Sequence, residues 1–185
     1  ITLGDREVLL VHKALGLSYF PDTVTTVLER KPELKLLVTA GIGSFAVSGK
    51  DMRHLSRAEP VLERGSPGSF DNGYAGISGI YRHSDGDLYV LYHSEDQENM
   101  PEVGPGVPGF YAQVCLARSK DGGKSYEKLG PVIKSAQPKT LDGMPDQGCG
   151  ELCVTPDSTG RYLLCYYVDH SRIENRGVQI FVARA

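Results

Sequence analysis

The sequence has no excess of positive charge and no long apolar run. Its 185 residues include 20 basic and 23 acidic side chains, which give a net charge of −3, and the basic residues form no run along the chain. Proteins that bind nucleic acid or anionic membranes through charge carry a basic face or stripe. A membrane-spanning helix needs roughly 20 consecutive apolar residues, and no stretch approaches that length. We therefore expect neither nucleic acid nor a membrane to be a partner.

The cysteines lack the paired C-x-x-C spacing of zinc sites. Cys115, Cys149, Cys153 and Cys165 lie within or beside apolar runs, which favours buried thiols. Cys153 and Cys165 could instead face each other across one hairpin and form a disulfide, so the sequence does not decide between a secreted or periplasmic location and a cytoplasmic one. The first residues, "ITLGDREV", contain neither Met nor a signal-type apolar region, and we expect any targeting segment to have been removed.

Helix signals are also few, and the composition indicates β-structure. The chain is 40% hydrophobic, with 22 Gly, 11 Pro and 10 Tyr, and short β-branched and aromatic runs alternate with turn residues. The stretch "TVTTVLERKPELKLL" is broken by Pro32 and is rich in Thr and Val, which favours two strands joined by a turn over one helix. The length fits one domain or a large part of one. We predict an all-β domain.

Two long segments of the chain repeat each other. "GISGIYRHSDGDLYVLYHSED" and "GELCVTPDSTGRYLLCYYVDHS" each contain an apolar strand, a turn ending in Gly86 or Gly160, and an aromatic-rich strand. The match continues from "YAQVCLARS" to "GVQIFVARA", where Gln113 corresponds to Gln179. A weaker copy upstream reads as four strands, "TVTTVLE", "LKLLVTA", "SFAVSG" and "RHLSRAEPVL". Repeated four-stranded meanders are typical of β-propeller blades.

The stretch "SKDGGKSY" (119–126) matches the pattern S-x-D-x-G-x-x-aromatic. Asp121 can accept hydrogen bonds from the backbone of its own turn, Gly123 can adopt a positive φ, and Tyr126 can pack into the blade. The pattern resembles the Asp box, the turn between the third and fourth strands of sialidase-like propeller blades. We expect it to stabilise a turn and to take no part in catalysis.

The repeats predict blade one at about residues 23–62, blade two at about 75–133 and an incomplete blade three at 151–185. A closed ring needs at least about four blades, so we expect a propeller truncated to about three. An open sheet edge is seldom left uncovered. We expect this edge to be covered by residues before Asp22, by another copy of the chain in a homo-oligomer, or by a C-terminal segment missing from the sequence.

One acidic residue stands just before or at the first strand of each predicted blade: Asp22 in "YFPDTVT", Asp71 in "SFDNGYAGISG" and Glu151 in "DQGCGELCV". The innermost strands of blades surround a central channel, where three such carboxylates can meet. The arrangement resembles the five-bladed β-propeller glycoside hydrolases, the clan that contains families 43 and 32. The resemblance implies that Asp22 is the general base or nucleophile, that Asp71 positions the substrate and tunes the acidity of the site, and that Glu151 is the general acid.

The resemblance therefore predicts a glycoside hydrolase with a carbohydrate substrate. Cleavage of a glycosidic bond needs one protonated carboxyl for the leaving oxygen and one ionised carboxylate near the anomeric carbon. The alternative is a non-catalytic propeller that binds carbohydrate or serves as an assembly module, because fold alone does not decide function. A sialidase is a third choice, but Arg118 and Arg184 repeat at the ends of third strands, which indicates a structural role and no arginine triad.

Five further residues are candidates for substrate binding: His93, Tyr111, Asp146, Gln147 and His170. The two histidines each precede a serine at the end of a second strand, where they could bind sugar hydroxyls or, as in some relatives, help to hold a channel Ca²⁺. Turn histidines are the alternative. The tyrosine could stack on a sugar ring or be buried in the blade, and the Asp-Gln pair could contact substrate or only shape its loop.

The acidic cluster of Glu95, Asp96 and Glu98 lies in the insertion within predicted blade two. Such a cluster could bind Ca²⁺, but a solvated loop is the simpler interpretation. Apart from the channel Ca²⁺ alternative, we predict no metal ligands and no cofactor.

Overall fold

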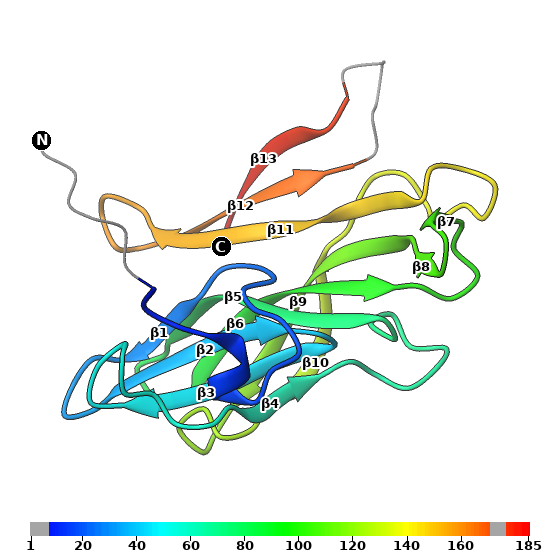
Figure 1. Ribbon diagram of the computed structural model, residues 1–185. Helices are drawn as coiled ribbons and strands as arrows, with labels where there is room; N and C mark the ends of the chain where they lie inside the picture. Colours follow the sequence, from blue (N-terminus) through cyan, green and yellow to red (C-terminus); the bar gives the residue numbers. More distant parts are fainter. Residues whose placement is uncertain (1–7, 171–176) are drawn as a thin grey trace, which may run out of the picture.

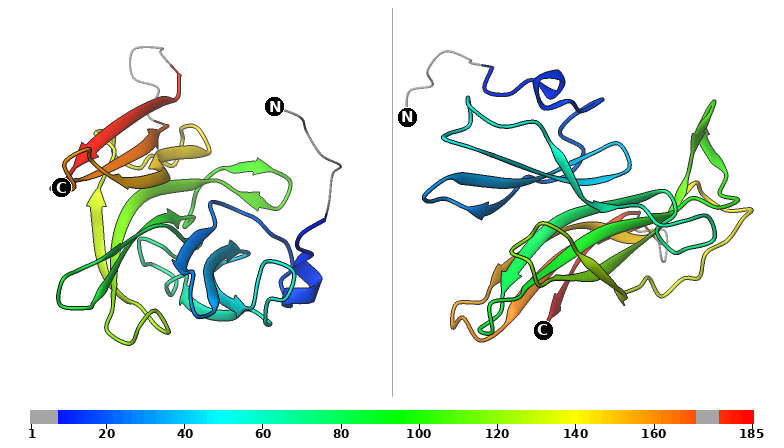
Figure 2. Two further views of the ribbon diagram at one scale, coloured as in Figure 1. Left: turned by 90° about the vertical axis from the view of Figure 1, so that its left-hand side faces the viewer. Right: turned by 90° about the horizontal axis from the view of Figure 1, so that it is seen from below.

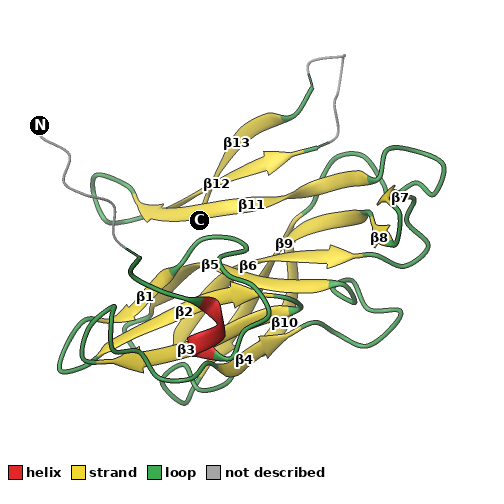
Figure 3. Ribbon diagram, in the orientation of Figure 1, coloured by secondary structure: helices red, strands yellow, loops and turns green. Residues whose placement is uncertain are grey.

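The computed structural model describes residues 8–170 and 177–185, and nearly all of its regular structure is β-strand (Figure 1). The only helix among these residues is η1 (His12–Leu15), a short 3₁₀ helix (Figure 3). The strands are β1 (Thr26–Glu29), β2 (Leu34–Ala40), β3 (Gly43–Gly49), β4 (Glu59–Glu63), β5 (Tyr74–Arg82), β6 (Leu88–Asp96), β7 (Glu102–Gly104), β8 (Val107–Pro108), β9 (Phe110–Ser119), β10 (Glu127–Ile133), β11 (Asp146–Pro156), β12 (Leu163–Asp169) and β13 (Gln179–Arg184). Within the described part of the chain, no helix is long and apolar enough to cross a membrane. The all-β prediction is confirmed.

The first sheet is an antiparallel meander in the order β1-β2-β3-β4. The run "TVTTVLERKPELKLL" forms β1 and β2 with Pro32 in the connection, as the sequence predicts. β2 and β3 pair along their whole length around a two-residue turn. Gly41 adopts a φ of 61° in this turn, a conformation that costs glycine little and keeps the hairpin tight.

The second group of strands has the order β5-β6-β9-β10 and is also antiparallel. The insertion between β6 and β9 forms the small β7–β8 hairpin. In the turn from β9 to β10, the carboxylate of Asp121 accepts hydrogen bonds from the backbone N–H groups of Lys124 and Ser125 and from the hydroxyls of Ser119 and Ser125. Tyr126 then packs into the main core. These contacts anchor β10 to the sheet.

The third group, β11-β12-β13, is antiparallel, and a short parallel pairing of β11 with β9 joins it to the second group. That pairing runs from Asp146↔Phe110 to Gly148↔Ala112. In the left view of Figure 2, the blue-to-cyan first sheet, the green second group and the orange-to-red third group follow one another around an arc. The three groups therefore succeed one another in space in the order of the sequence.

The outer edge of β13 is open in the described part of the chain, where this strand pairs with β12 alone. Its side chains are unusually exposed for an apolar strand, with Ile180 at 77% and Val182 at 56%. The expectation that residues before Asp22 supply a covering strand is wrong for residues 8–21. Leu15 and Leu17 in that segment pack against the first sheet instead, because β2 and β3 offer them an apolar face.

Strand β2 shows how the first sheet is covered on both faces. Leu36 and Val38 cluster with Leu15 of η1, whereas Leu37 packs with Ile77 and other residues of the second group. Successive side chains of a strand point to opposite faces, so alternate residues of β2 enter two different cores. The buried cluster that connects β9, β11 and β12 is smaller. The third group is thus the least enclosed part of the molecule.

The repeated arginines lie on tyrosine rings of neighbouring segments. The guanidinium carbon of Arg118 is 5.7 Å from the ring centroid of Tyr89, and that of Arg184 is 4.6 Å from the ring centroid of Tyr162. Arg118 also donates from Nε to a carboxylate oxygen of Asp87 at 2.6 Å. Both arginines therefore cover the surface of their sheets, as expected for structural residues.

All four cysteines are free thiols. The register of β11 and β12 places Cys153 opposite Tyr166 and Cys165 opposite Val154. Neighbouring residues of a strand point to opposite faces, so the two thiols cannot approach each other across this hairpin. The sequence-based suggestion of a Cys153–Cys165 disulfide is therefore wrong for this structure.

Alkylation of the native chain with iodoacetamide is expected to modify Cys153 alone. Burial raises the pKa of Cys115 and Cys165 to about 11 and that of Cys149 to about 12, whereas Cys153 is exposed. Because only the thiolate reacts, the three buried thiols should react at least about 100-fold more slowly near neutral pH. Mass spectrometry of the digested protein measures this. Equal labelling of all four cysteines under native conditions would contradict the packing described here.

Candidate active site

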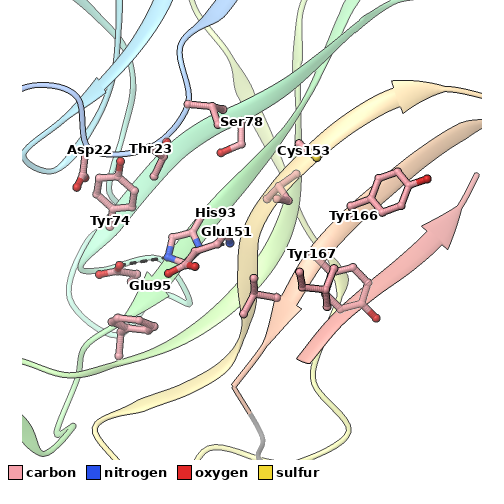
Figure 4. A pocket seen from close by; sticks show the side chains of 15 residues that line it. Asp22, Thr23, Tyr74, Ser78, His93, Glu95, Glu151, Cys153, Tyr166 and Tyr167 are labelled. Atoms are coloured by element: carbon pink, nitrogen blue, oxygen red, sulfur yellow. Dashed lines mark hydrogen bonds and ion pairs between the residues drawn. The ribbon is translucent and has the colours of Figure 1, made fainter. Parts of the chain in front are cut away.

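A pocket of about 520 Å³ lies where the first sheet, the second group and the third group of strands meet (Figure 4). Its walls combine carboxylates, aromatic rings and aliphatic side chains from all three groups. The lining residues include Asp22, Tyr74, Ser78, His93, Glu95, Phe110, Glu151, Tyr166 and Tyr167. The pocket therefore draws on segments that are far apart in the sequence.

Asp22 comes from the loop before β1, and hydrogen bonds to β2 hold this loop in place. The backbone N–H of Asp22 donates to the carbonyl of Thr39 at 3.2 Å, and the N–H of Thr23 donates to the Thr39 hydroxyl at 2.8 Å. Thr39 is only 1% exposed, so this anchor is part of the packed sheet. The backbone at Asp22 is thereby held against a buried strand, while the side chain stays exposed at the pocket.

Glu151 lies at a β-bulge in β11. Gly150 pairs with Val168 and the next pair is Cys153 with Tyr166, so β11 contains one residue more than β12 between these two pairs. Glu151 has a φ of 47°, in the left-handed region that residues with a Cβ seldom occupy. Bulges redirect side chains, and unfavourable backbone conformations gather at functional sites. Here the bulge turns the carboxyl of Glu151 into the pocket.

Strand β5 has a second bulge that also supplies a polar group to the pocket. Its register shifts between Ile77↔Tyr92 and Gly79↔Leu91, which leaves Ser78 as the extra residue. The hydroxyl of Ser78 lies at the pocket wall. Nothing in the spacing of apolar residues along β5 indicates this irregularity, and the sequence did not predict a role for Ser78.

His93 and Glu95 of β6 form a hydrogen-bonded pair next to Glu151, in which His93 is buried and Glu95 is partly buried. His93 is 2% exposed, and its Nε2 lies 3.2 Å from Oε1 of Glu95. The Nδ1 atom accepts a hydrogen bond from the backbone N–H of Glu151 at 3.0 Å. Glu95 also accepts a hydrogen bond from the side-chain amide of Gln97 at 2.8 Å. Glu95 is thus the third carboxylate of the pocket, beside Asp22 and Glu151.

The sequence assigned Glu95 to a solvated acidic cluster, and the structure corrects this for one of its members. Side chains alternate along a strand, so Glu95 shares the face of His93 whereas Asp96 points the other way. Asp96 accepts a hydrogen bond from Asn72 and pairs with Lys139. Because His93 lies in a predicted strand, this alternation predicts that Glu95, two residues later, points to the same side as the histidine.

Tyr74 presents an unpartnered hydroxyl next to Asp22. The ring is 4% exposed, and the buried hydroxyl has no hydrogen-bond partner among the described residues. Burial, together with the neighbouring Asp22 carboxylate, raises the pKa of Tyr74 well above its usual range. Tyr74 is therefore protonated at any physiological pH and is a buried hydrogen-bond donor beside Asp22.

Asp71 lies elsewhere and does not line this pocket. It is 1% exposed, and its carboxylate pairs with Nζ of Lys128 at 2.5 Å, accepts a hydrogen bond from the Ser69 hydroxyl at 3.1 Å, and lies 3.4 Å from the Tyr92 hydroxyl. These partners belong to its own loop and to β6 and β10. The structure therefore brings Asp22 and Glu151 together and keeps Asp71 apart from them.

Four of the predicted substrate-binding residues line a neighbouring pocket of about 470 Å³: Tyr111, Asp146, Gln147 and His170. The Tyr111 hydroxyl donates to the carbonyl of Gln137, and the Gln147 amide is bonded to the loop that contains Thr140. Only His93 of the five predicted residues lines the first pocket. Phe110 lies between the two sites, with its ring centroid 5.9 Å from that of His93 and 5.8 Å from that of His170.

Metal ligation receives no support from the arrangement of the described residues. Across residues 8–170 and 177–185, no group of three or more His, Cys, Asp or Glu side chains is placed to hold an ion.

The sequence matches no known family model and no curated protein. Solved structures do resemble it. A thermostable family-43 glycoside hydrolase has a TM-score of 0.56 at 15% identity, covering 90% of this chain and 51% of its own. The GH32 β-fructofuranosidase of Bombyx mori has a TM-score of 0.54 at 17% identity, covering 88% and 32%. An endo-arabinase from Bacteroides thetaiotaomicron has a TM-score of 0.53 at 15% identity, covering 91% and 52%.

These likenesses show the fold, which is the β-propeller of such glycosidases. The chain spans about half the length of the family-43 enzyme and of the endo-arabinase, and about a third of the β-fructofuranosidase. At this level of identity, a common fold does not carry a common activity.

Proposed function

We propose that this chain carries the catalytic carboxylates of a glycoside hydrolase and that its substrate is an oligo- or polysaccharide. One observation supports this most directly. Asp22 of the first group and Glu151 of the third group line a single pocket, although 129 positions separate them in the sequence (151 − 22 = 129). Most glycoside hydrolases cleave the glycosidic bond with two carboxyl groups that face one pocket.

In this proposal, Glu151 is the general acid and Asp22 is the general base or nucleophile. Glu151 protonates the leaving oxygen of the glycosidic bond. Asp22 either activates a water molecule on the opposite side of the sugar or attacks the anomeric carbon itself. A carboxyl separation of about 6.5–9.5 Å would leave room for the water of an inverting reaction, and about 5–5.5 Å would fit a retaining one. By resemblance to family 43 we favour inversion.

Other pocket residues suit sugar binding. The ring of Tyr74 lines the pocket next to Asp22, with its hydroxyl buried. Tyr166 and Tyr167 of β12 place aromatic rings on the opposite wall, and Phe110 of β9 also lines the pocket. Aromatic rings bury a large apolar area while the tyrosine hydroxyls stay available for hydrogen bonds. Such a wall fits the apolar face and hydroxyl rim of a sugar ring.

The alternative is a non-catalytic module that binds carbohydrate in the same pocket or serves in assembly. The exposure of the third group favours this candidate, because Tyr166 is 40% exposed and Ile180 of the pocket wall is 77% exposed. An open wall admits water and weakens the electrostatic contribution of a closed site to catalysis. Binding without turnover would follow.

Incubation with arabino-, xylo- and fructo-oligosaccharides tests the proposal. We expect one class to bind in calorimetry and to release reducing ends or monosaccharides, and the Asp22→Asn chain to bind it with little or no release. Asp142→Asn, at an exposed position outside this pocket, is the matched control. Binding by both chains without hydrolysis by the unsubstituted chain would favour the module. Absence of both binding and hydrolysis across the panel would overturn the proposal.

A further inference from the structure

We propose that His93 is a positioning residue that holds Glu151 in its bulged, left-handed conformation, and that Glu95 fixes the tautomer of the His93 ring. The contribution of this pair to catalysis rests on the proposed function, because it acts through the proposed general acid. The geometry of the pair is independent of that function and can be measured without any substrate.

The direction of one hydrogen bond defines the protonation of His93. A backbone N–H can only donate, so the 3.0 Å contact from the N–H of Glu151 requires that Nδ1 of His93 carries no proton. The proton of a neutral imidazole then lies on Nε2, which is 3.2 Å from Oε1 of Glu95 and donates to it. His93 is therefore a neutral bridge between Glu95 and the backbone of Glu151.

The hydrogen bond from the Glu151 N–H to His93 takes the place of a backbone pairing that β11 lacks at its bulge. The register shift between Gly150 and Cys153 removes Glu151 from the regular pairing of β11 with β12. The N–H of Glu151, which is partly buried, has lost its regular partner in the sheet, and Nδ1 of His93 accepts its hydrogen bond instead. The left-handed conformation of Glu151 is unfavourable for a residue with a Cβ, so it persists only where contacts of this kind hold it.

The surroundings leave the His93 ring little freedom to turn. A Cβ placed on Gly150 would lie 2.0 Å from Nδ1, so the backbone passes directly over the ring and position 150 accepts only glycine. The rings of Tyr74 and Phe110 contact the imidazole edge to face, each with its centroid 5.9 Å away. The side-chain amide of Gln97 holds the second oxygen of Glu95 at 2.8 Å.

The first test is the ¹⁵N NMR spectrum of the histidine rings in the unsubstituted chain. We expect His93 to be the Nε2–H tautomer with an unprotonated Nδ1, and we expect a scalar coupling across the hydrogen bond from the Glu151 amide to Nδ1. A protonated Nδ1, or a doubly protonated ring at neutral pH, would overturn the proposal. This measurement needs neither a variant nor an active enzyme.

The second test compares His93→Leu with His93→Asn. Leucine removes the acceptor, whereas the oxygen of asparagine can lie near the place of Nδ1 and rescue the hydrogen bond. Hydrogen exchange of the Glu151 amide should be about 10-fold faster or more in His93→Leu and close to the original rate in His93→Asn, with the amides of β2 and β3 unchanged in both. Equal acceleration at all of these amides would indicate a merely structural role for His93 and contradict the proposal.

The third test applies once a substrate is found. Misplacing a catalytic group by about 1 Å can cost about 100-fold in rate, so His93→Leu should lower kcat by about that factor with KM changed less than about 3-fold. His93→Asn should recover part of the loss. If exchange behaves as expected but no hydrolysis is found in any chain, the proposed function fails and the positioning contact stands. If kcat is unchanged in His93→Leu, the positioning role in catalysis is refuted.

Discussion

Glu151→Gln is expected to lower hydrolysis by about 10²–10⁴-fold, the contribution of a positioned general acid, while the fold and substrate binding are kept. The amide has nearly the shape of the carboxyl but has no acidic proton to give to the leaving oxygen. The side chain of Glu151 is exposed at the pocket, so its replacement leaves the cores intact. Initial rates on the best substrate of the panel, with thermal unfolding of both chains, measure the effect.

Glu127→Gln provides the matched control for this loss. Glu127 is an exposed acid on β10, outside the pocket, and its substitution changes the net charge by the same amount. We expect its rate to stay within about 2-fold of the original, as for most surface substitutions. If Glu151→Gln kept a third or more of the activity, Glu151 would not be the proton donor, and the pocket would need another acid in that role.

Asp71→Ala is expected to destabilise the chain by about 2–4 kcal/mol. Among the described contacts, Asp71 is the only charged group paired with the half-buried ammonium of Lys128. The substitution also removes the carboxylate that accepts hydrogen bonds from the hydroxyls of Ser69 and Tyr92. Breaking a buried pair leaves one charge uncompensated, and the partial exposure of Lys128 lessens the penalty. Urea unfolding at neutral pH measures the change.

The double substitution Asp71→Ala with Lys128→Met separates charge pairing from packing. Removing both partners leaves no unpaired charge, so we expect it to recover a large part of the lost stability. A chain with unchanged stability but abolished hydrolysis after Asp71→Ala would show instead that Asp71 acts in catalysis, as its sequence position before β5 suggests. Destabilisation with hydrolysis retained in the folded fraction is the outcome that its place in the structure favours.

The sequence does not predict that Glu95 lines the pocket and that Asp71 does not. Asp71 stands just before the first strand of predicted blade two, at the repeat position, whereas Glu95 stands in an acidic run within that blade. A loop residue has no fixed side-chain direction until its loop packs, and Asp71 packs against Lys128 in the interior. Glu95 continues a strand, so its direction follows from alternation once the strand is known.

The bulges of β5 and β11 cannot be predicted from the residue pattern of either strand. A bulge inserts one residue into a ladder without changing the composition of the strand. Glu151 enters the pocket because of such an insertion, and its left-handed backbone is stabilised by His93, which lies 58 positions earlier in the chain. No local pattern around "GCGELCV" could reveal that contact.

The sequence by itself determined the all-β class, the repeated meanders and the turn at Asp121, because strand alternation, β-branched runs and turn residues act over short distances along the chain. It also singled out Asp22, His93 and Glu151. Only the tertiary structure decided that these three share one pocket, that Glu95 joins them and that Asp71 does not. The physical reason is that a pocket is formed by the packing of separate sheets, and the direction in which each side chain enters it depends on bulges and loops fixed by distant contacts.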